Sequence, residues 1–275
     1  MFTLKINNQI RAFYHPLIMG ILNVTDDSFY DGGTSTTEKE ILSKADRIVS
    51  QGADIIDIGA CSTRPNANFV SEKEEITRIE KSLSVIRQKY PDVIISIDTF
   101  RSKVAEISVN KYQANIINDI SAGNSDPKMF DTIANLQVPY ILTHSRIKKN
   151  NINNGTYNNI TNEVIYELSE KLKELKSRNI CDIIIDPGFG FSKNLEQNYE
   201  LMKNIDFFRT FEHPLLVGIS RKSMIYKLTN ETPQEALAGT TGLNAFCFLN
   251  NIEIIRVHDI AEAVRLKTVI EALKK

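Results

Sequence analysis

Side chains that can do chemistry recur in this sequence at one kind of position, the end of a short apolar run. Two carboxylates and an amide stand at three of these positions, as Asp98, Asn118 and Asp186. Such groups accept hydrogen bonds, and a set of them facing inward suits a planar heterocycle with several N–H donors. The sequence therefore predicts a binding floor for a flat ring such as a pterin or a guanine.

A second set of polar residues carries positive charge or hydrogen-bond donors and suits an anion. Guanidinium groups bind phosphate through paired hydrogen bonds. Lys222 could connect the two sets, since its ammonium could also reach a ring carbonyl. Asn23 offers a neutral oxygen ligand that could hold Mg²⁺ against a bound pyrophosphate. The cationic and donor set consists of Arg64, Ser220, Arg221, Lys222, Arg256 and His258.

Each of these residues also has a structural explanation. An aspartate at the end of a strand often caps the following helix, and a single histidine is more often a core residue than a ligand. The case for a site rests on their number, because all eight run ends carry polar groups. A fold without a site would not bury so many groups that must lose their water.

The elements that position these residues are eight β-rich apolar runs, each followed by a polar turn and a helical pattern. Such runs, alternating with helices, are typical of a parallel sheet buried on both faces. Eight evenly spread units favour a closed (β/α)8 barrel, in which phosphate is commonly bound after strands seven and eight. The clearest helical patterns cover 37–52, with Gly52 as the stop, and 163–180. The runs begin at Ile18, Asp54, Val93, Ile116, Tyr140, Asp182, Leu215 and Glu253.

We expect one domain over residues 1–275. A barrel of this kind needs roughly 250 residues, and the 275 residues show no linker, repeat or second core. The opening segment 1–14 is expected to form a β-hairpin that turns at Asn7–Asn8. This hairpin would cover the N-terminal face of the barrel.

Charge and cysteine content limit the partners and the compartment. A formal net charge of −1 gives no general attraction for nucleic acid or an anionic membrane. Cys61, Cys181 and Cys247 lie far apart, which favours free thiols in a reducing compartment. The N-terminal segment has no apolar stretch long enough for a signal peptide or a membrane span. We therefore expect a cytoplasmic protein without nucleic-acid or membrane partners.

Seven ordered segments resemble the dihydropteroate synthase family of folate biosynthesis over nearly the whole chain. They are IMGILNVTDDSFYDGG, GADIIDIGACSTRP, SIDTFRS, IINDISAG, IDPGFGFSKN, VGISRKSMI and IIRVHD. Several motifs in order at barrel spacing are far more specific than a single glycine-rich loop. The resemblance implies a Mg²⁺-assisted transferase that condenses 6-hydroxymethyl-7,8-dihydropterin pyrophosphate with p-aminobenzoate, giving 7,8-dihydropteroate and pyrophosphate.

The resemblance also implies a role for each residue that matches a family position. The pterin positions are Asp98, Asn118, Asp186 and Lys222. The catalytic positions are Asp186, Lys222, Arg256 and Asp98. The pyrophosphate positions, with Asn23 as the magnesium contact, are Asn23, Ser62, Thr63, Arg64, Arg256 and His258. The p-aminobenzoate positions are Phe29, Thr63, Phe191, Ser220 and Lys222.

Two positions depart from the pattern of this family. Asp26 replaces the proline of the V-T-P-D-S segment, which frees the first loop and adds negative charge near the pyrophosphate. Thr143 replaces a methionine before His144, so an apolar packing surface becomes smaller and partly polar. We expect weaker pterin binding with the chemistry retained. Cys61, beside Ser62, is expected to serve as a small residue rather than as a reactive thiol.

Two other functions are compatible with parts of the sequence. A methyltetrahydrofolate-binding methyltransferase module uses a related barrel but holds no pyrophosphate, and the SRK and RVHD clusters favour the synthase. A non-catalytic pterin-binding paralogue would release no pyrophosphate, and the changes at Asp26 and Thr143 leave room for it. The resemblance further implies competition by sulfonamides, which mimic p-aminobenzoate. It also implies a homodimer, built through the last helices and including 243–249.

Overall fold

The computed structural model of the protein describes residues 1–25, 37–61, 70–146 and 156–274. Several predicted site positions, Asp26, Phe29, Ser62, Thr63 and Arg64, lie outside the described residues. Their roles therefore stay predictions.

The predicted (β/α)8 barrel is confirmed. Each of the eight apolar runs contains a strand, and the strands pair in parallel in the order β8-β7-β6-β5-β4-β3-β10-β9. A parallel bridge between Ile185 and Leu215 joins the two ends of this order and closes the ring. The strands are β3 (Leu17–Asn23), β4 (Ile55–Gly59), β5 (Ile94–Asp98), β6 (Ile116–Asp119), β7 (Tyr140–Thr143), β8 (Ile183–Asp186), β9 (Leu216–Val217) and β10 (Ile254–Val257).

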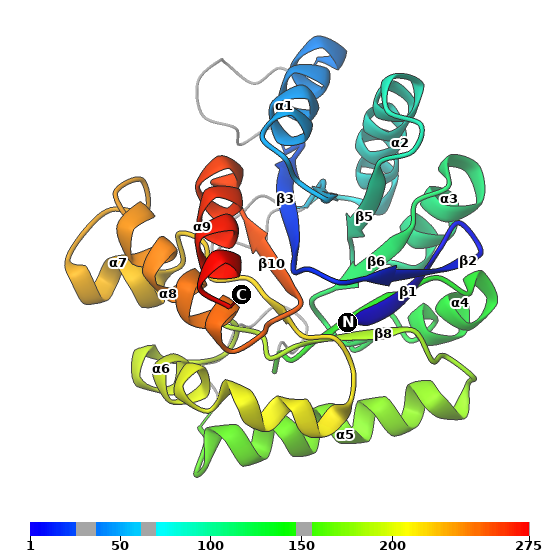
Figure 1. The fold of residues 1–275 in the computed structure, drawn as a ribbon. Coiled ribbons are helices and arrows are strands. Elements are labelled where there is room, and N and C mark those ends of the chain that lie inside the picture. The colour runs from blue at the N-terminus through cyan, green and yellow to red at the C-terminus, as the bar shows by residue number, and fades with distance from the viewer. Residues whose placement is uncertain (26–36, 62–69, 147–155, 275) are drawn as a thin grey trace.

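Helices surround the strands, as Figure 1 shows. Among the described residues, no helix is both long and apolar enough to cross a membrane. The helices are α1 (Glu38–Ser50), α2 (Glu72–Lys89), α3 (Ser102–Tyr112), α4 (Met129–Leu136), α5 (Ile160–Ser177), α6 (Leu195–Lys203), α7 (Ser223–Thr229), α8 (Leu237–Leu249) and α9 (Ile260–Leu273). A 3₁₀ helix, Ile205–Phe211, follows α6.

Local sequence signals explain where α1 begins and ends. Thr37 precedes it and exchanges hydrogen bonds with Glu40: the Thr37 hydroxyl accepts from the Glu40 N–H at 3.3 Å, and the Glu40 carboxylate accepts from the Thr37 N–H at 2.6 Å. Such a capping box stabilises a helix by about 1 kcal/mol. Gly52, the predicted stop, has φ +92°, which glycine adopts without strain.

The barrel interior has an apolar half and a polar half. Toward the N-terminal ends of the strands, inward-facing apolar side chains form one cluster: Leu17, Met19, Ile55, Ile94, Ile116, Ile141, Ile184, Leu216 and Ile254. Two residues further along a strand the side chain faces the same way. At that step the inner face becomes polar, with Asp57, Ser96, Asn118, Thr143, Asp186 and Arg256. The prediction of strands apolar on both faces is therefore wrong for this half, because these positions line the candidate site.

The predicted hairpin is confirmed and covers the apolar end of the barrel. Strands β1 (Phe2–Ile6) and β2 (Gln9–Phe13) pair antiparallel. The turn residues Asn7 and Asn8 have φ of 52° and 61°, a left-handed conformation that asparagine tolerates. Side chains from both strands join the apolar cluster of the barrel floor: Leu4, Ile6 and Phe13. The hairpin therefore closes the barrel opposite the candidate site (Figure 1).

Candidate active site

Strand register places the predicted polar residues at one mouth of the barrel. Across β3, β4, β5 and β6, the pairs Asn23–Gly59, Gly59–Asp98 and Asp98–Asn118 form one continuous row. Asp186 is paired with Thr143 across β7 and β8. Because all the strands run in parallel, their C-terminal ends meet at the same rim. The sequence expectation that these side chains lie together agrees with this geometry.

An ion cluster centred on Arg256 occupies the middle of this mouth. Its Nε donates to Asp57 Oδ2 at 2.6 Å, and its Nη2 donates to Asp98 Oδ2 at 2.7 Å. Asn118 Nδ2 donates to the same Asp57 oxygen at 3.2 Å. The Asp57 side chain is fully buried. This cluster fixes the Arg256 guanidinium between two strands far from its own in the sequence.

Asp57 is a site residue that sequence reasoning missed. It lies in the middle of an apolar run, whereas the polar groups of the predicted site stand at the ends of such runs. A usable signal was its spacing: Asp57 is two residues before Gly59, so both face the barrel interior.

The charges in this cluster shift one another's protonation. Burial raises the pKa of Asp98, Arg256 opposes the shift and the neighbouring Asp57 adds to it, which together bring the pKa to about 7. Burial alone would lower the pKa of Arg256, but Asp57 and Asp98 hold it above its ordinary value. Arg256 therefore stays charged, while Asp98 changes charge near neutral pH.

Asp186 and Lys222 form the second charged pair of the mouth. Asp186 Oδ1 accepts the Gly188 N–H at 2.8 Å, and the Thr143 hydroxyl lies 3.5 Å from Oδ2. The Lys222 ammonium donates to the Phe189 carbonyl. Burial lowers the pKa of Lys222 to about 8, opposed by the charge of Asp186. Burial likewise raises the pKa of Asp186, opposed by Lys222.

Phe191 lies next to this pair, where it was predicted to line an aromatic subsite. The Lys222 ammonium sits 4.5 Å from the centre of its ring, within the range of a cation–π contact. Phe191 is half-buried in the turn after β8. Phe191 thus lies beside Lys222, and both were predicted to be p-aminobenzoate positions.

The remaining donors divide into two groups. Ser220 is buried, and its hydroxyl accepts the His258 N–H at 3.2 Å and lies 3.1 Å from His258 Nδ1. Ser220 therefore holds His258 in place. Arg221 does not join the mouth: its guanidinium binds both oxygens of Asp259, at 2.9 and 2.6 Å. Its φ of +56° turns the side chain away from its neighbours Ser220 and Lys222.

Two other polar residues near the ends of the strands have structural roles. Asp119 points outward from β6, where it accepts the Tyr140 hydroxyl at 2.7 Å and the N–H groups of Ser121 and Gly123. Cys61 donates to the buried Glu75 at 3.2 Å. Burial and the charge of Glu75 raise the pKa of this thiol to about 12, so it stays protonated. This agrees with the expectation that Cys61 is a small packing residue.

Comparison with known proteins identifies the class to which this barrel and its site belong. The family model described as "Pterin binding enzyme" matches residues 19–258, which include every strand of the barrel except the first two residues of β3. The chain is thus a pterin-binding barrel enzyme.

The relatives define the family more closely. The chain is 39% identical over 261 residues to dihydropteroate synthase from Escherichia coli (strain K12), covering 94% of this chain and 92% of that one. A Yersinia pestis dihydropteroate synthase, solved in complex with a sulfonamide drug, superposes with a TM-score of 0.91 at 35% identity and covers 99% of both chains. The folic acid synthesis protein fol1 of Pneumocystis carinii is 38% identical across 98% of this chain, which spans 38% of that longer protein. The chain belongs to the dihydropteroate synthase family.

Proposed function

We propose that the protein condenses 6-hydroxymethyl-7,8-dihydropterin pyrophosphate with p-aminobenzoate, releasing pyrophosphate and 7,8-dihydropteroate. The observation that carries this proposal is the meeting of two chemistries at one barrel mouth. The acceptors Asp98, Asn118 and Asp186 lie there beside the cations Lys222 and Arg256. The acceptors suit the N–H groups of the ring, and the cations suit the charge of the leaving group. Membership of the synthase family supports the same assignment.

The pterin would lie on the inner face of β5, β6 and β8. Asp98, Asn118 and Asp186 stand at or near the ends of these strands and are buried or half-buried. Buried carboxylates are costly unless a partner satisfies them. The amino and ring N–H groups of a pterin would supply such partners, and the Lys222 ammonium would reach the ring carbonyl.

Thr143 is expected to weaken this pterin binding. Its side chain is fully buried beside Asp186. We expect Thr143→Met to lower the pterin dissociation constant roughly fivefold, because it restores apolar contact worth about 0.8 kcal/mol per buried methylene. Calorimetric titration with the pterin measures this. Thr143→Val is the matched control, since it removes the hydroxyl without lengthening the side chain. An unchanged constant in Thr143→Met would refute the packing argument.

Mg²⁺ is proposed to accompany the pyrophosphate at Asn23, which is exposed at the end of β3. A Cβ on Gly59 would lie 3.4 Å from Asn23 Oδ1 and 3.7 Å from Asp98 Oδ2, so glycine keeps the space between these oxygens open. Within the described ranges, no three His, Cys, Asp or Glu side chains could bind a metal together. One neutral oxygen suits an ion that keeps water and phosphate as its other ligands. When bound, the ion would neutralise charge on the leaving pyrophosphate.

The condensation needs no nucleophile from the protein. The amine nitrogen of p-aminobenzoate bonds to the exocyclic methylene carbon, the carbon–oxygen bond to pyrophosphate breaks, and the amine releases one proton. Asp98 and Asp186 would fix the ring and favour positive charge that develops on it. Arg256 and His258 would bind the departing pyrophosphate, with Arg256 held in position by Asp57. Catalysis is then largely electrostatic and positional.

The second substrate would enter beside Phe191 and Lys222. The ring of Phe191 and the ammonium of Lys222 are in contact there, offering an apolar surface and a charge to an aromatic carboxylate. Sulfonamides share the shape of p-aminobenzoate, so they should compete for this place. Competition would show as a rise in the apparent KM for p-aminobenzoate with kcat unchanged.

The deciding experiment measures pyrophosphate release from the purified protein with the dihydropterin pyrophosphate and Mg²⁺. We expect release only when p-aminobenzoate is present, with dihydropteroate formed in equal amount. Chelation of Mg²⁺ should abolish release, and added Mg²⁺ should restore it. Pterin binding without release would instead indicate a non-catalytic paralogue. Binding of methyltetrahydrofolate in preference to the pyrophosphate ester would indicate a methyltransferase module.

The pH dependence of kcat/KM should peak between about pH 7 and about pH 8. Asp98 must be ionised to accept N–H groups at both oxygens and to favour positive charge on the ring, and its pKa of about 7 sets the acid limb. Lys222 must be charged to bind a carbonyl or carboxylate, and its pKa of about 8 sets the alkaline limb. Lys222→Arg should lose the alkaline limb alone, because a guanidinium stays charged. A wild-type profile that stays flat across both values would contradict this assignment.

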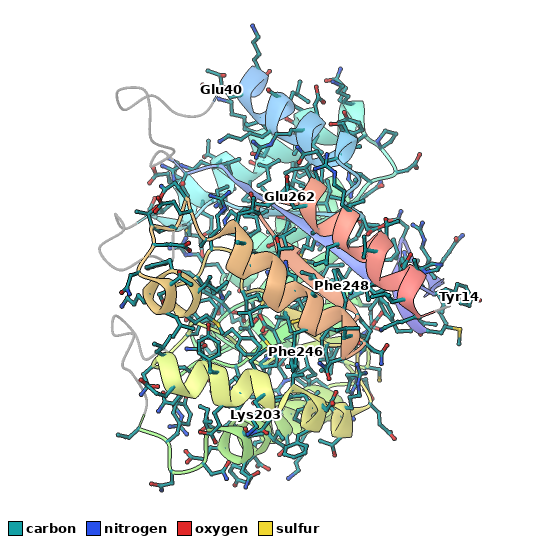
Figure 2. The ribbon with its side chains drawn as sticks, turned by 60° about the vertical axis from the view of Figure 1, so that its left-hand side comes forward. Tyr14, Glu40, Lys203, Phe246, Phe248 and Glu262 are labelled. Atoms are coloured by element: carbon teal, nitrogen blue, oxygen red, sulfur yellow. The ribbon has the colours of Figure 1, made fainter. Side chains whose placement is uncertain are left out.

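A homodimer through α8 and α9 is also proposed, with apolar side chains on these helices as its support. The two helices lie side by side in Figure 2, where Phe246 is labelled on α8. Their exposed apolar residues are Phe246, Leu249, Val269 and Leu273. Exposed apolar patches of this kind are typical of subunit interfaces. Light scattering should give twice the chain mass, and Leu249→Glu should give a monomer.

A cytoplasmic location is proposed on the state of the cysteines. Cys61, Cys181 and Cys247 are all free thiols, of which Cys181 is exposed. Free exposed thiols persist in reducing compartments. Fractionation of the producing cell, with the protein followed by immunoblot, tests this location.

A further inference from the structure

The buried ammonium of Lys193 is the strongest polar feature that the proposed reaction does not use. Lys193 is 6% exposed. Its Nζ donates to the Gly188 carbonyl at 2.8 Å and the Phe191 carbonyl at 3.1 Å, and lies 3.0 Å from His144 Nδ1. The first two groups belong to the turn after β8, and the third follows β7. One side chain thus ties the turn 187–193 to the neighbouring strand end.

The chemistry of the ammonium fixes the state of His144. Burial lowers the pKa of Lys193 to about 7, and opposite its ammonium form, which has only donors, His144 Nδ1 must accept. The ring proton is then on Nε2, which faces Glu167 Oε2 at 3.0 Å and donates to it. Burial and the charge of Lys193 lower the pKa of His144 to about 4, so the ring is neutral at physiological pH. The hydrogen bonds therefore run in one direction, from Lys193 through His144 to Glu167.

The outer end of this chain is anchored on the helix layer. Glu167 lies on α5 and accepts Arg146 Nε at 2.9 Å. The Arg146 guanidinium also binds Glu163 and stacks over the ring of Tyr157 at 3.8 Å. The charge of Glu167 is thus held by a cation that is itself restrained from two sides.

The turn that Lys193 holds is also tied at Gly190, whose N–H donates to Asn198 Oδ1 at 2.7 Å, and at Phe189, which is fully buried. Gly188 and Gly190 both have positive φ, of 73° and 79°, and glycine restricts the backbone least. This turn places the Phe191 ring 4.5 Å from the Lys222 ammonium, and its Phe189 carbonyl accepts from the same ammonium. Asp186 belongs to β8 itself, and its side chain accepts the Gly188 N–H of the turn at 2.8 Å.

We propose that Lys193, acting through His144 and Glu167, is a positioning residue that holds Phe191 and Lys222 in place for the aromatic amine substrate. The inference rests on the proposed synthase function. It adds that the turn 187–193 helps to bind the aromatic amine substrate. Loss of the chain should raise the KM for p-aminobenzoate much more than it raises the pterin dissociation constant. Two of the pterin acceptors, Asp98 and Asn118, lie on β5 and β6, outside this turn, whereas Lys222 and Asp186 contact it.

The test compares Glu167→Gln and Lys193→Met with Glu170→Gln as the matched control. Glu170 lies on the same helix but pairs with Lys173 at the surface. We expect Lys193→Met to raise the KM for p-aminobenzoate by about tenfold or more, since misplacement of a binding group by about 1 Å costs up to two orders of magnitude. Glu167→Gln should give a smaller rise in the same constant, because glutamine still accepts from His144 but lacks the charge. In both variants the pterin dissociation constant, measured by calorimetry, should change severalfold less than the KM for p-aminobenzoate.

Several outcomes would overturn the proposal. Equal changes in pterin binding and in the KM for p-aminobenzoate would indicate a general structural role. A wild-type KM for p-aminobenzoate in Glu167→Gln would show that the hydrogen-bond chain from Lys193 through His144 to Glu167 does not position the turn. This result would decide the question even if Lys193→Met failed to fold. A readout independent of activity is the nitrogen NMR spectrum of the four histidines. His144 should be neutral with its proton on Nε2, and the opposite tautomer would contradict the chain.

The failure of this inference can be told from failure of the proposed function. If the wild-type protein releases pyrophosphate but Lys193→Met shows no selective rise, only the positioning role is wrong. If the wild-type protein binds pterin but no p-aminobenzoate, both are wrong. The histidine spectrum reports on the relay in either case.

Discussion

Asp186→Asn should lower kcat/KM by about two to three orders of magnitude while the protein stays folded. Removal of one preorganised electrostatic contact to a developing charge typically costs this much. Asp186 is a buried carboxylate at the pterin floor, and asparagine keeps its shape but not its charge. Loss of the Asp186 charge would weaken the hydrogen bonds to the ring N–H groups. It would also reduce the stabilisation of positive charge on the ring. Steady-state assays of dihydropteroate formation, with circular dichroism to confirm folding, measure the effect.

Asp119→Asn is the matched control for this prediction. Asp119 is equally buried and also ends a barrel strand, but it faces outward and caps the turn that contains Ser121 and Gly123. We expect it to lower stability and leave kcat/KM of the folded protein near the wild-type value. Near-normal activity in Asp186→Asn would remove that residue from the mechanism. Equal losses in both variants would show that any buried carboxylate at this rim matters only for folding.

The fold was predictable because its signals are local and repeated. Each parallel strand is a short apolar run that ends at a polar residue, and eight of them at regular spacing leave few alternatives to a barrel. The hairpin turn was predictable for the same reason, since two asparagines between alternating residues favour the left-handed backbone observed at Asn7 and Asn8. Strand ends meet at one rim in any parallel barrel, so Asp98, Asn118, Asp186 and Arg256 could be grouped from sequence alone.

The other contacts of the site depend on the direction in which each side chain points. The number of residues between a side chain and the end of its strand does not predict that direction. Arg221 stands between two residues of the mouth, yet its left-handed backbone directs it to Asp259. Lys193 lies in a polar turn and resembles any surface lysine, but its ammonium points inward, to two carbonyls of the turn and to His144, which follows β7. Asp57 stands inside an apolar run, and its partner Arg256 lies 199 positions away in the sequence. The residues around Asp57 therefore do not show that it has a charged partner. Long-range ion pairs of this kind are invisible to a local pattern.

Arg256→Met is expected to destabilise the protein by about 3–5 kcal/mol and to abolish activity. Breaking a buried ion pair by removing one partner leaves an uncompensated buried charge, and this is the usual cost. Asp57 is fully buried, and Asp98 is shielded within the same cluster. Both would lose their cation at once. Urea denaturation of the ligand-free protein at neutral pH measures the change in the free energy of unfolding.

The lost stability should depend on pH with a defined sign. Burial already raises the pKa of Asp98 to about 7, and Arg256 opposes that shift, so its removal raises the pKa further. A carboxyl whose folded-state pKa is raised binds its proton more tightly in the folded state than in the unfolded state. Its contribution is therefore most favourable below the unfolded pKa of about 4 and is lost as the pH rises through the folded pKa. Arg256→Met should be more stable at acid than at neutral pH, over a wider window than the wild type.

A second substitution separates the structural role of Arg256 from its chemical one. Asp57→Asn in the Arg256→Met background removes one of the two stranded charges and keeps an amide that can still bond to Asn118. We expect this double variant to recover much of the lost free energy of unfolding and none of the activity, since the pyrophosphate would still lack its cation. Recovery of both would mean that Arg256 serves only to neutralise Asp57. If the double variant recovers neither stability nor activity, Asp98 rather than Asp57 is the carboxylate that depends on Arg256.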